Sequence, residues 1–387
     1  MKKTVLILAT ITLSALLASC FHAKDKGGME NPEAGNDSPA MKLLNSVDFT
    51  KEGLVSMIKS KDVLTDVEYE ALILAYSKVG IDKDKLELDN NPVASARSEI
   101  MKDHKAPDNA KEIDKKLLTN EYPQVRGYIL SSFRSIFGTS SNDCNELVKM
   151  LKEEKNDYVI NCGIKTLSNE MKQPAVAEFI FSQVENKHPA IRTQCAYAIG
   201  NSWTEGVKGA KEAVLKLMND RDPDVQKAMY RSCGKLHDPT LVPELVKALN
   251  DPAKVKLHSD CVESLYYLWY DYPFHKQTCK EAYEATLAYF KKTPRTNDDP
   301  AWNSVGELAT QAESNYAQWR SKATYFKPEE YVAVMSDIAK DTNANWLARN
   351  AAIKVIKKIG KPSDWEAVKK AIESNSGDDK KNLLLKD

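Results

Sequence analysis

The 387-residue chain lacks an excess of either charge, because 55 basic residues are balanced by 55 acidic ones. A nucleic-acid-binding surface needs a concentrated positive face, so the balance gives no support to a nucleic-acid partner. The length alone suggests two or three domains. With 42% hydrophobic residues, the chain has enough apolar material for a sizeable core.

Long hydrophobic runs are also missing beyond the first residues. The apolar run from Val5 to Leu17 follows the basic residues Lys2 and Lys3. A membrane-spanning helix needs about 20 apolar residues, and this shorter run is typical of a secretory signal peptide instead. We expect the mature chain to be soluble apart from any anchor.

The end of this run places a cysteine behind small residues, as Leu17-Ala18-Ser19-Cys20. This motif resembles the lipobox of bacterial lipoproteins. The resemblance implies that residues 1–19 are removed and that Cys20 carries the fatty acids, and two or more chains hold a protein firmly on a membrane. Residue 21 is Phe and not the Asp that retains lipoproteins at the inner membrane, which favours the outer membrane without saying which face.

Strand signals are scarce, since no turn dipeptide stands between alternating apolar runs. Helix-start signals are frequent instead. Capping-box spacing occurs at Thr65 with Glu68 and at Ser363 with Glu366, and four prolines stand where first-turn prolines belong: Pro123, Pro189, Pro223 and Pro328. The sequence therefore predicts an all-α fold.

An internal repeat organises most of the chain. The segments "PQVRGYILSSF", "DYVINCGIKTL", "PAIRTQCAYAIG" and "PDVQKAMYRSCG" begin at Pro123, Asp157, Pro189 and Pro223. Each carries a β-branched apolar residue two places on, and a second apolar-periodic segment follows each one. This nearly constant spacing is typical of helical repeats. One repeat is therefore predicted to be a helix, a turn and a second helix.

The repeat resembles HEAT-type repeats through Pro-x-(Val/Ile)-Arg at Pro123–Arg126 and Pro189–Arg192, and through a late copy with Arg349 and Gly360. The resemblance implies a right-handed α-solenoid of stacked helix pairs, in which Arg126, Arg192 and Arg349 brace the turns between repeats. Each pair exposes an apolar face that only stacking can bury.

The domain prediction follows from these patterns. A flexible, Gly/Asn/Asp/Pro-rich tether covers residues 20–44, and a divergent helical cap covers 45–118. The repeats run over 119–376 with an irregular part at 293–344, and the tail 377–387 is predicted to be disordered.

Six further cysteines leave two alternatives open. Cys144 with Cys162, and Cys261 with Cys279, share one sequence spacing and lie on neighbouring predicted helices, which makes two disulfides conceivable in an envelope protein. The other reading is that small thiols fill tight seams between helices. No metal or cofactor is expected, because no C-x-x-C or H-E-x-x-H occurs.

The stretch "YYLWYDYPF" at residues 266–274 is the strongest candidate contact surface. Helical phase puts Val262, Leu265, Tyr266 and Trp269 in the core, and Tyr267 and Tyr270 on the opposite face. Tyr272 and Phe274 then fall in the following turn. Exposed tyrosines offer contact area and a hydroxyl at low entropy cost, so these four aromatics are the predicted partner-binding residues.

These features predict a lipid-anchored, non-catalytic envelope protein that binds or scaffolds a protein or peptide. Two alternatives remain. Some HEAT-like proteins resemble bilin lyases, and His237, His258 and His275 fall in successive segments, so an enzyme or enzyme subunit is one alternative. A structural component that binds cell-wall polymer through its tyrosines is the other.

Overall fold

The structure is a computed structural model that describes residues 38–136, 138–269, 278–292, 305 and 323–386. The all-α prediction is confirmed. Within these residues, the strands are limited to the short antiparallel pair β1 (Ile81–Asp82) and β2 (Glu87–Leu88). The right-handed sense of a solenoid stays a prediction.

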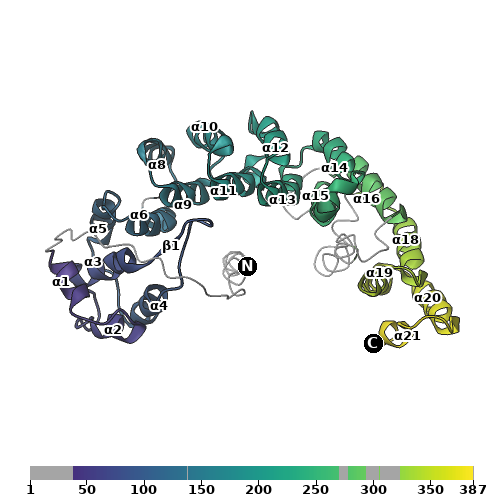
Figure 1. Ribbon diagram of the computed structural model, residues 1–387, viewed down its shortest axis with the longest axis horizontal. Coiled ribbons are helices and arrows are strands. Elements are labelled where there is room, and N and C mark those ends of the chain that lie inside the picture. Colours follow the sequence, from purple (N-terminus) through teal and green to yellow (C-terminus); the bar gives the residue numbers. More distant parts are fainter. Residues whose placement is uncertain (1–37, 137, 270–277, 293–304, 306–322, 387) are drawn as a thin grey trace, which may run out of the picture. The chain divides into compact units, whose positions relative to one another are not determined.

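Two layers of helices build the repeat region (Figure 1). The first helix of each pair packs against the first helix of its neighbour, as α6 does with α9, α9 with α11, α11 with α13 and α13 with α15. These first helices are α6 (Pro123–Ser131), α9 (Asp157–Leu167), α11 (Pro189–Ile199), α13 (Pro223–Ser232), α15 (His258–Trp269) and, later in the chain, α19 (Trp346–Ile359).

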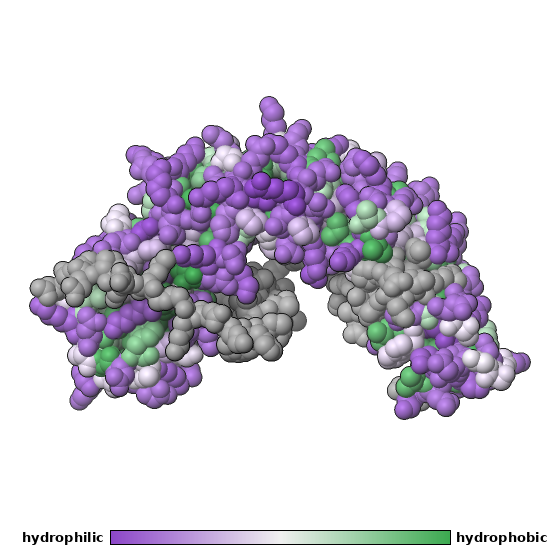
Figure 2. Space-filling view, in the orientation of Figure 1, coloured by the Kyte–Doolittle hydropathy of each residue, from purple (hydrophilic) through white to green (hydrophobic). Residues whose placement is uncertain are grey.

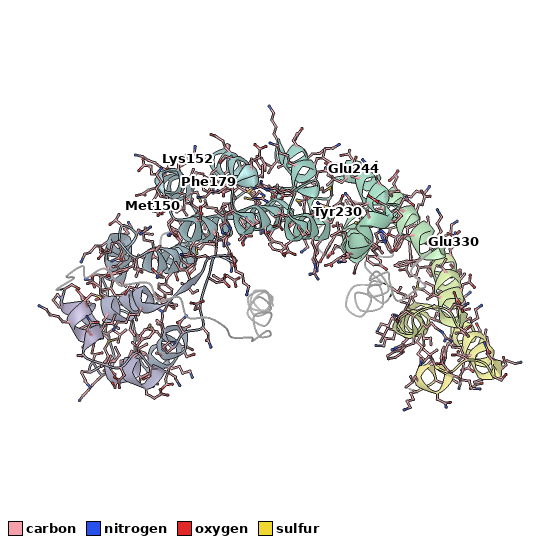
Figure 3. The ribbon with its side chains drawn as sticks, in the orientation of Figure 1. Met150, Lys152, Phe179, Tyr230, Glu244 and Glu330 are labelled. Atoms are coloured by element: carbon pink, nitrogen blue, oxygen red, sulfur yellow. The ribbon has the colours of Figure 1, made fainter. Side chains whose placement is uncertain are left out.

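The second helices form the other layer. Here α8 packs with α10, and α14, α16, α18 and α20 pack in succession. Their bounds are α8 (Ser141–Glu153), α10 (Pro174–Ser182), α12 (Ala210–Met218), α14 (Val242–Leu249), α16 (Lys280–Lys292), α18 (Pro328–Lys340) and α20 (Pro362–Ser374). In Figure 3 the labelled Lys152, Glu244 and Glu330 come from second helices, whereas Tyr230 comes from the first helix α13.

Local chemistry starts the helices largely where the sequence predicts. All four first-turn prolines are at the first positions of their helices, and Thr65 with Glu68 forms a complete capping box. The capping box predicted at Ser363 with Glu366 is wrong. Helix α20 begins at Pro362, and Asp364 accepts the hydrogen bond from the Lys361 backbone.

The repeated β-branched position is the centre of the core. Val125, Val159, Ile191 and Val225 are all 0% exposed. Next to it, side-chain hydroxyls bind the backbone of the preceding first helix: Thr166 Oγ1 donates to the Leu130 carbonyl at 2.7 Å, and Ser264 Oγ donates to the Tyr230 carbonyl at 2.5 Å. Gly234 lies so close to this seam that an added Cβ would stand 2.1 Å from the Ser264 carbonyl oxygen. Short residues therefore let the first helices approach closely.

Arginine clamps brace three of the turns, at the positions that the resemblance implies. Arg192 donates to both Asp220 oxygens at 2.7 and 2.8 Å and to the Asn186 carbonyl at 2.8 Å. Arg126 does the same with Glu154 and the Asn120 carbonyl. Arg349 grips Asp378 with two nitrogens and donates to the Ala339 carbonyl.

The clamp carboxylates also organise the next helix. Asp220 accepts the backbone N–H of Asp222, which is the N-cap of α13. Burial of Asp220 opposes its ionisation, but the hydrogen bonds from Arg192 and Asp222 outweigh burial and lower its pKa below 3.8. In α13 itself the arginine position is Gln226, whose amide still donates to the Asp220 carbonyl at 2.6 Å.

The N-terminal cap has its own apolar core, and a hairpin connects it to the repeats. Its helices are α1 (Pro39–Asn45), α2 (Lys51–Ser56), α3 (Asp66–Leu74), α4 (Val93–Asp103) and α5 (Ala110–Leu117). From the β1–β2 hairpin, the Leu86 carbonyl accepts Asn161 of α9 at 3.4 Å, and the Lys83 carbonyl lies 2.8 Å from Nε2 of His188. The hairpin therefore contacts two successive repeats.

Both ends of the helical body differ from the prediction. Helix α1 already begins at Pro39, inside the predicted tether. The tail predicted to be disordered from residue 377 contains α21 (Lys381–Leu384), which packs on α19 and buries Leu384 to 1% exposure. The clamp between Arg349 and Asp378 explains this order, because it supplies a buried partner that composition does not reveal.

We predict that Arg192→Met lowers the free energy of unfolding by about 3–5 kcal/mol, because it leaves the buried Asp220 carboxylate without its partner. Chemical denaturation followed by circular dichroism measures this change. The matched control is Lys216→Met, which removes an exposed pair with Glu185 at 2.8 Å and should cost less than about 1 kcal/mol. Equal losses in the two variants would contradict the clamp's role.

Candidate partner-binding surface

The first helices leave one side uncovered by the second helices, which pack on the other side of the row (Figure 1). One repeat position lies midway along this uncovered side. It is occupied by Lys165 in α9, Tyr197 in α11, Arg231 in α13 and Glu263 in α15. We use the name first-helix face for a set of residues from these helices and from the short helices η3 (Ser202–Thr204) and η4 (Cys233–Leu236) that follow α11 and α13: Lys165, Tyr197, Trp203, Lys227, Arg231, Lys235, Glu263 and Tyr267.

Two exposed aromatics stand out on this face. Tyr197 of α11 is 48% exposed, and Trp203 in the short helix η3 (Ser202–Thr204) directly after α11 is 52% exposed. The Asn201 side chain fixes the start of η3 by accepting the Trp203 N–H at 3.2 Å. Exposed Trp and Tyr are common anchors of protein interfaces.

Sequence reasoning missed both residues. The available signal was that Tyr197 occupies a repeat position where the other copies have Ser131, Lys165 and Arg231. A large aromatic side chain at a repeat position that is otherwise polar indicates a surface contact more than a core contact.

The predicted aromatic stretch is only partly described. Val262, Leu265, Tyr266 and Trp269 are in the core, as predicted. Tyr267 is half-buried on the opposite side, where the Lys235 ammonium lies 4.8 Å from its ring centroid. Tyr270, Tyr272 and Phe274 lie outside the described residues, so only Tyr267 joins the first-helix face.

The charges on this face gather around Arg231. Its Nε lies 3.2 Å from Glu263 and 4.0 Å from Asp260, whose side chain is 8% exposed. Burial raises the pKa of Asp260 to about 6, although Lys227 and Arg231 favour its ionised form. Over much of the visible surface, hydrophilic residues surround small hydrophobic patches (Figure 2). A partner that binds here would meet polar and aromatic groups together.

The cysteines of the described residues are free thiols, so the two disulfides considered from the sequence are not formed. Cys144 Sγ accepts a hydrogen bond from Gln173 at 3.3 Å, and Cys162 interacts with Tyr158. Burial raises the pKa of Cys162 to about 11 and that of Cys233 to about 12. These neutral thiols are packing residues, as in the alternative that small thiols fill the seams between helices.

The histidines have separate surroundings. His258 is buried on α15 with Nδ1 3.1 Å from the Tyr289 hydroxyl, whereas Nδ1 of His237 lies 3.9 Å from Glu205. His275 is outside the described residues. In the part of the chain that the structure covers, no three His, Cys, Asp or Glu side chains gather as a metal site would require.

The fold and this surface define an all-α helical-repeat protein. No family model matches the chain, and no curated protein matches it. Across the described segments, every helix is too short or too polar to traverse a lipid bilayer. Cys20 lies outside these segments.

The raised pKa of Asp260 predicts that the stability of the fold depends on pH. Its pKa of about 6 exceeds the ordinary 3.8, so the folded protein holds this proton more tightly than the unfolded chain. Stability is therefore lost as the pH rises from about 4 to about 6, and ionised Asp260 costs on the order of 3 kcal/mol above that range.

Asp260→Asn should accordingly raise the free energy of unfolding at pH 7.5 and leave it nearly unchanged at pH 4, as measured by urea denaturation at both values. Glu263→Gln is the control, because it removes a more exposed carboxylate and should give no gain. A gain for Asp260→Asn at both pH values would contradict the assignment.

Proposed function

We propose that the protein is a non-catalytic, lipid-anchored module of the bacterial cell envelope whose HEAT-type repeats bind a protein or peptide partner. The observation that supports this best is that exposed Tyr197 and Trp203 occur together with cations such as Arg231 on a surface that the second helices leave open. Rigid aromatic anchors on packed helices suit recognition, since little side-chain freedom is lost on binding.

Anchoring at the outer membrane is the second part of the proposal. It rests on the signal-like run Val5–Leu17 and on Cys20 within the lipobox-like motif. The segment that would connect the anchor to the helical body runs from Cys20 to Pro39, where α1 begins. As a flexible chain, a segment of this length would have a root-mean-square reach of roughly 25 Å, which is enough to hold the helical body away from the headgroups.

We predict that Cys20→Ser abolishes incorporation of a labelled fatty acid and moves the protein from the membrane fraction to the soluble fraction, because the acyl chains supply the attachment. Cys162→Ser, which changes a packing thiol, should keep both label and location. A Cys20→Ser protein that stays acylated, or a native chain without fatty acid, would contradict the anchor.

Site-specific photocrosslinking tests the binding surface. A photoreactive amino acid at position 197 is expected to give one discrete protein adduct in living cells, whereas the same group at position 244 on the second helix α14 should not. The adduct formed from position 197 should weaken several-fold when Trp203→Ala is added, because an interface anchor is lost. Adducts of equal yield from both positions, or none from position 197, would refute the proposed surface.

A further inference from the structure

Helix α11 presents an uncharged surface in the row of first helices, between α9 and α13 (Figure 1). The charged residue of this helix is Arg192, which is buried in its clamp. The residues of α11 that are not buried are all uncharged: Pro189, Ala190, Thr193, Gln194 and Tyr197. We call these residues, together with Trp203, the α11 surface.

Charges on one side of the α11 surface are compensated by neighbouring opposite charges. Outside the core, α9 carries one residue of each sign, Asp157 and Lys165, and Asp157 Oδ2 also lies 3.5 Å from Lys187 Nζ. In the loop that carries Trp203, Glu205 Oε2 lies 3.9 Å from Nδ1 of His237.

The charges of α13, on the other side, are compensated in the same way. Exposed Asp224 and Lys227 are three residues apart, so they are neighbours on the helix surface. Arg231 Nε lies 3.2 Å from Glu263 of α15. Because both signs occur on each flank, the electrostatics favour neither an acidic nor a basic occupant.

The loop after α11 fixes Trp203 near the end of the helix. Buried Thr204 donates from Oγ1 to the Ala198 carbonyl at 3.1 Å. Trp203 directly precedes Thr204, and Tyr197 directly precedes Ala198. One hydrogen bond therefore ties together the chain segments that carry the two exposed aromatics, and this order lowers the entropy cost of binding.

The α11 surface also offers hydrogen-bond donors beside its aromatic rings. The Trp203 indole N–H can only donate, and the Gln194 amide and the Tyr197 hydroxyl can donate as well. Within the described part of the chain, none of these three groups has a hydrogen-bond partner. Free carbonyl groups on an occupant would complement them.

We infer that the occupant of the α11 surface is an uncharged, proline-rich segment of a partner protein in the polyproline II conformation. Such segments dock on exposed aromatic side chains, and their carbonyl groups have no internal hydrogen-bond partners. A proline also has no N–H that would need an acceptor on the surface. The inference rests on the proposed function and adds the chemistry of the partner.

The test is fluorescence anisotropy with the full-length protein in detergent and short labelled peptides of equal length. The first contains only prolines and leucines, the second has serine in place of proline, and two more have glutamate or lysine in place of leucine. The uncharged proline peptide should bind tightest. Its affinity should change less than about twofold between low and physiological salt, because its binding depends on no ion pair.

Two exposed tryptophans supply a matched pair of variants. Trp203→Ala should weaken binding of the uncharged proline peptide about tenfold, because an interface anchor is lost. Trp346→Ala removes the exposed tryptophan at the start of α19 and should change the affinity less than about twofold. Circular dichroism checks that both variants remain folded.

Tighter binding of the serine peptide, of a charged peptide or of a neutral oligosaccharide would overturn the inference, and so would an equal loss in Trp346→Ala. If no peptide binds but position 197 still crosslinks to one envelope protein, the proline-rich occupant is refuted while the proposed function stands. Loss of that crosslink as well would refute both.

Discussion

Close stacking of the first helices is the constraint on which the rest of the structure depends. Each helix pair has an apolar face that it cannot cover by itself, and burial of Val125, Val159, Ile191 and Val225 requires neighbouring first helices to touch. Gly234 at the seam allows this approach, and the Ser264 hydroxyl donates to the Tyr230 carbonyl and accepts the Gly234 N–H. The surface that stays open is a consequence of that contact.

The arginine clamps add direction to this stacking. A guanidinium such as that of Arg192 has five donors in a fixed plane, so it can hold a carboxylate and the preceding turn at the same time. The carboxylate also accepts the backbone N–H of Asp222, the N-cap residue of the next first helix, which couples the end of one repeat to the start of another. Where Gln226 replaces arginine, only the turn contact remains.

A row of similar helices also presents the same exposed position once in every repeat. Packing constrains the residue type least at such exposed positions, since core residues and clamp residues are fixed by their neighbours. Tyr197, Arg231 and Glu263 occupy one such position with different chemistry, and the mixture gives the surface both aromatic area and charge. Buried Asp260, with a pKa of about 6, makes the neighbourhood of Arg231 sensitive to mild acid.

The sequence by itself determined the all-α class, the repeat period and the proline helix starts, because these follow from local periodicity and from short-range capping chemistry. The arginine braces were expected only from the resemblance of the repeat. Only the tertiary structure decided that Tyr197 and Trp203 are exposed, that the described cysteines stay free, and that Asp378 and Leu384 order the tail. Exposure and pairing depend on which distant surfaces meet, and residue order along one helix does not contain that information.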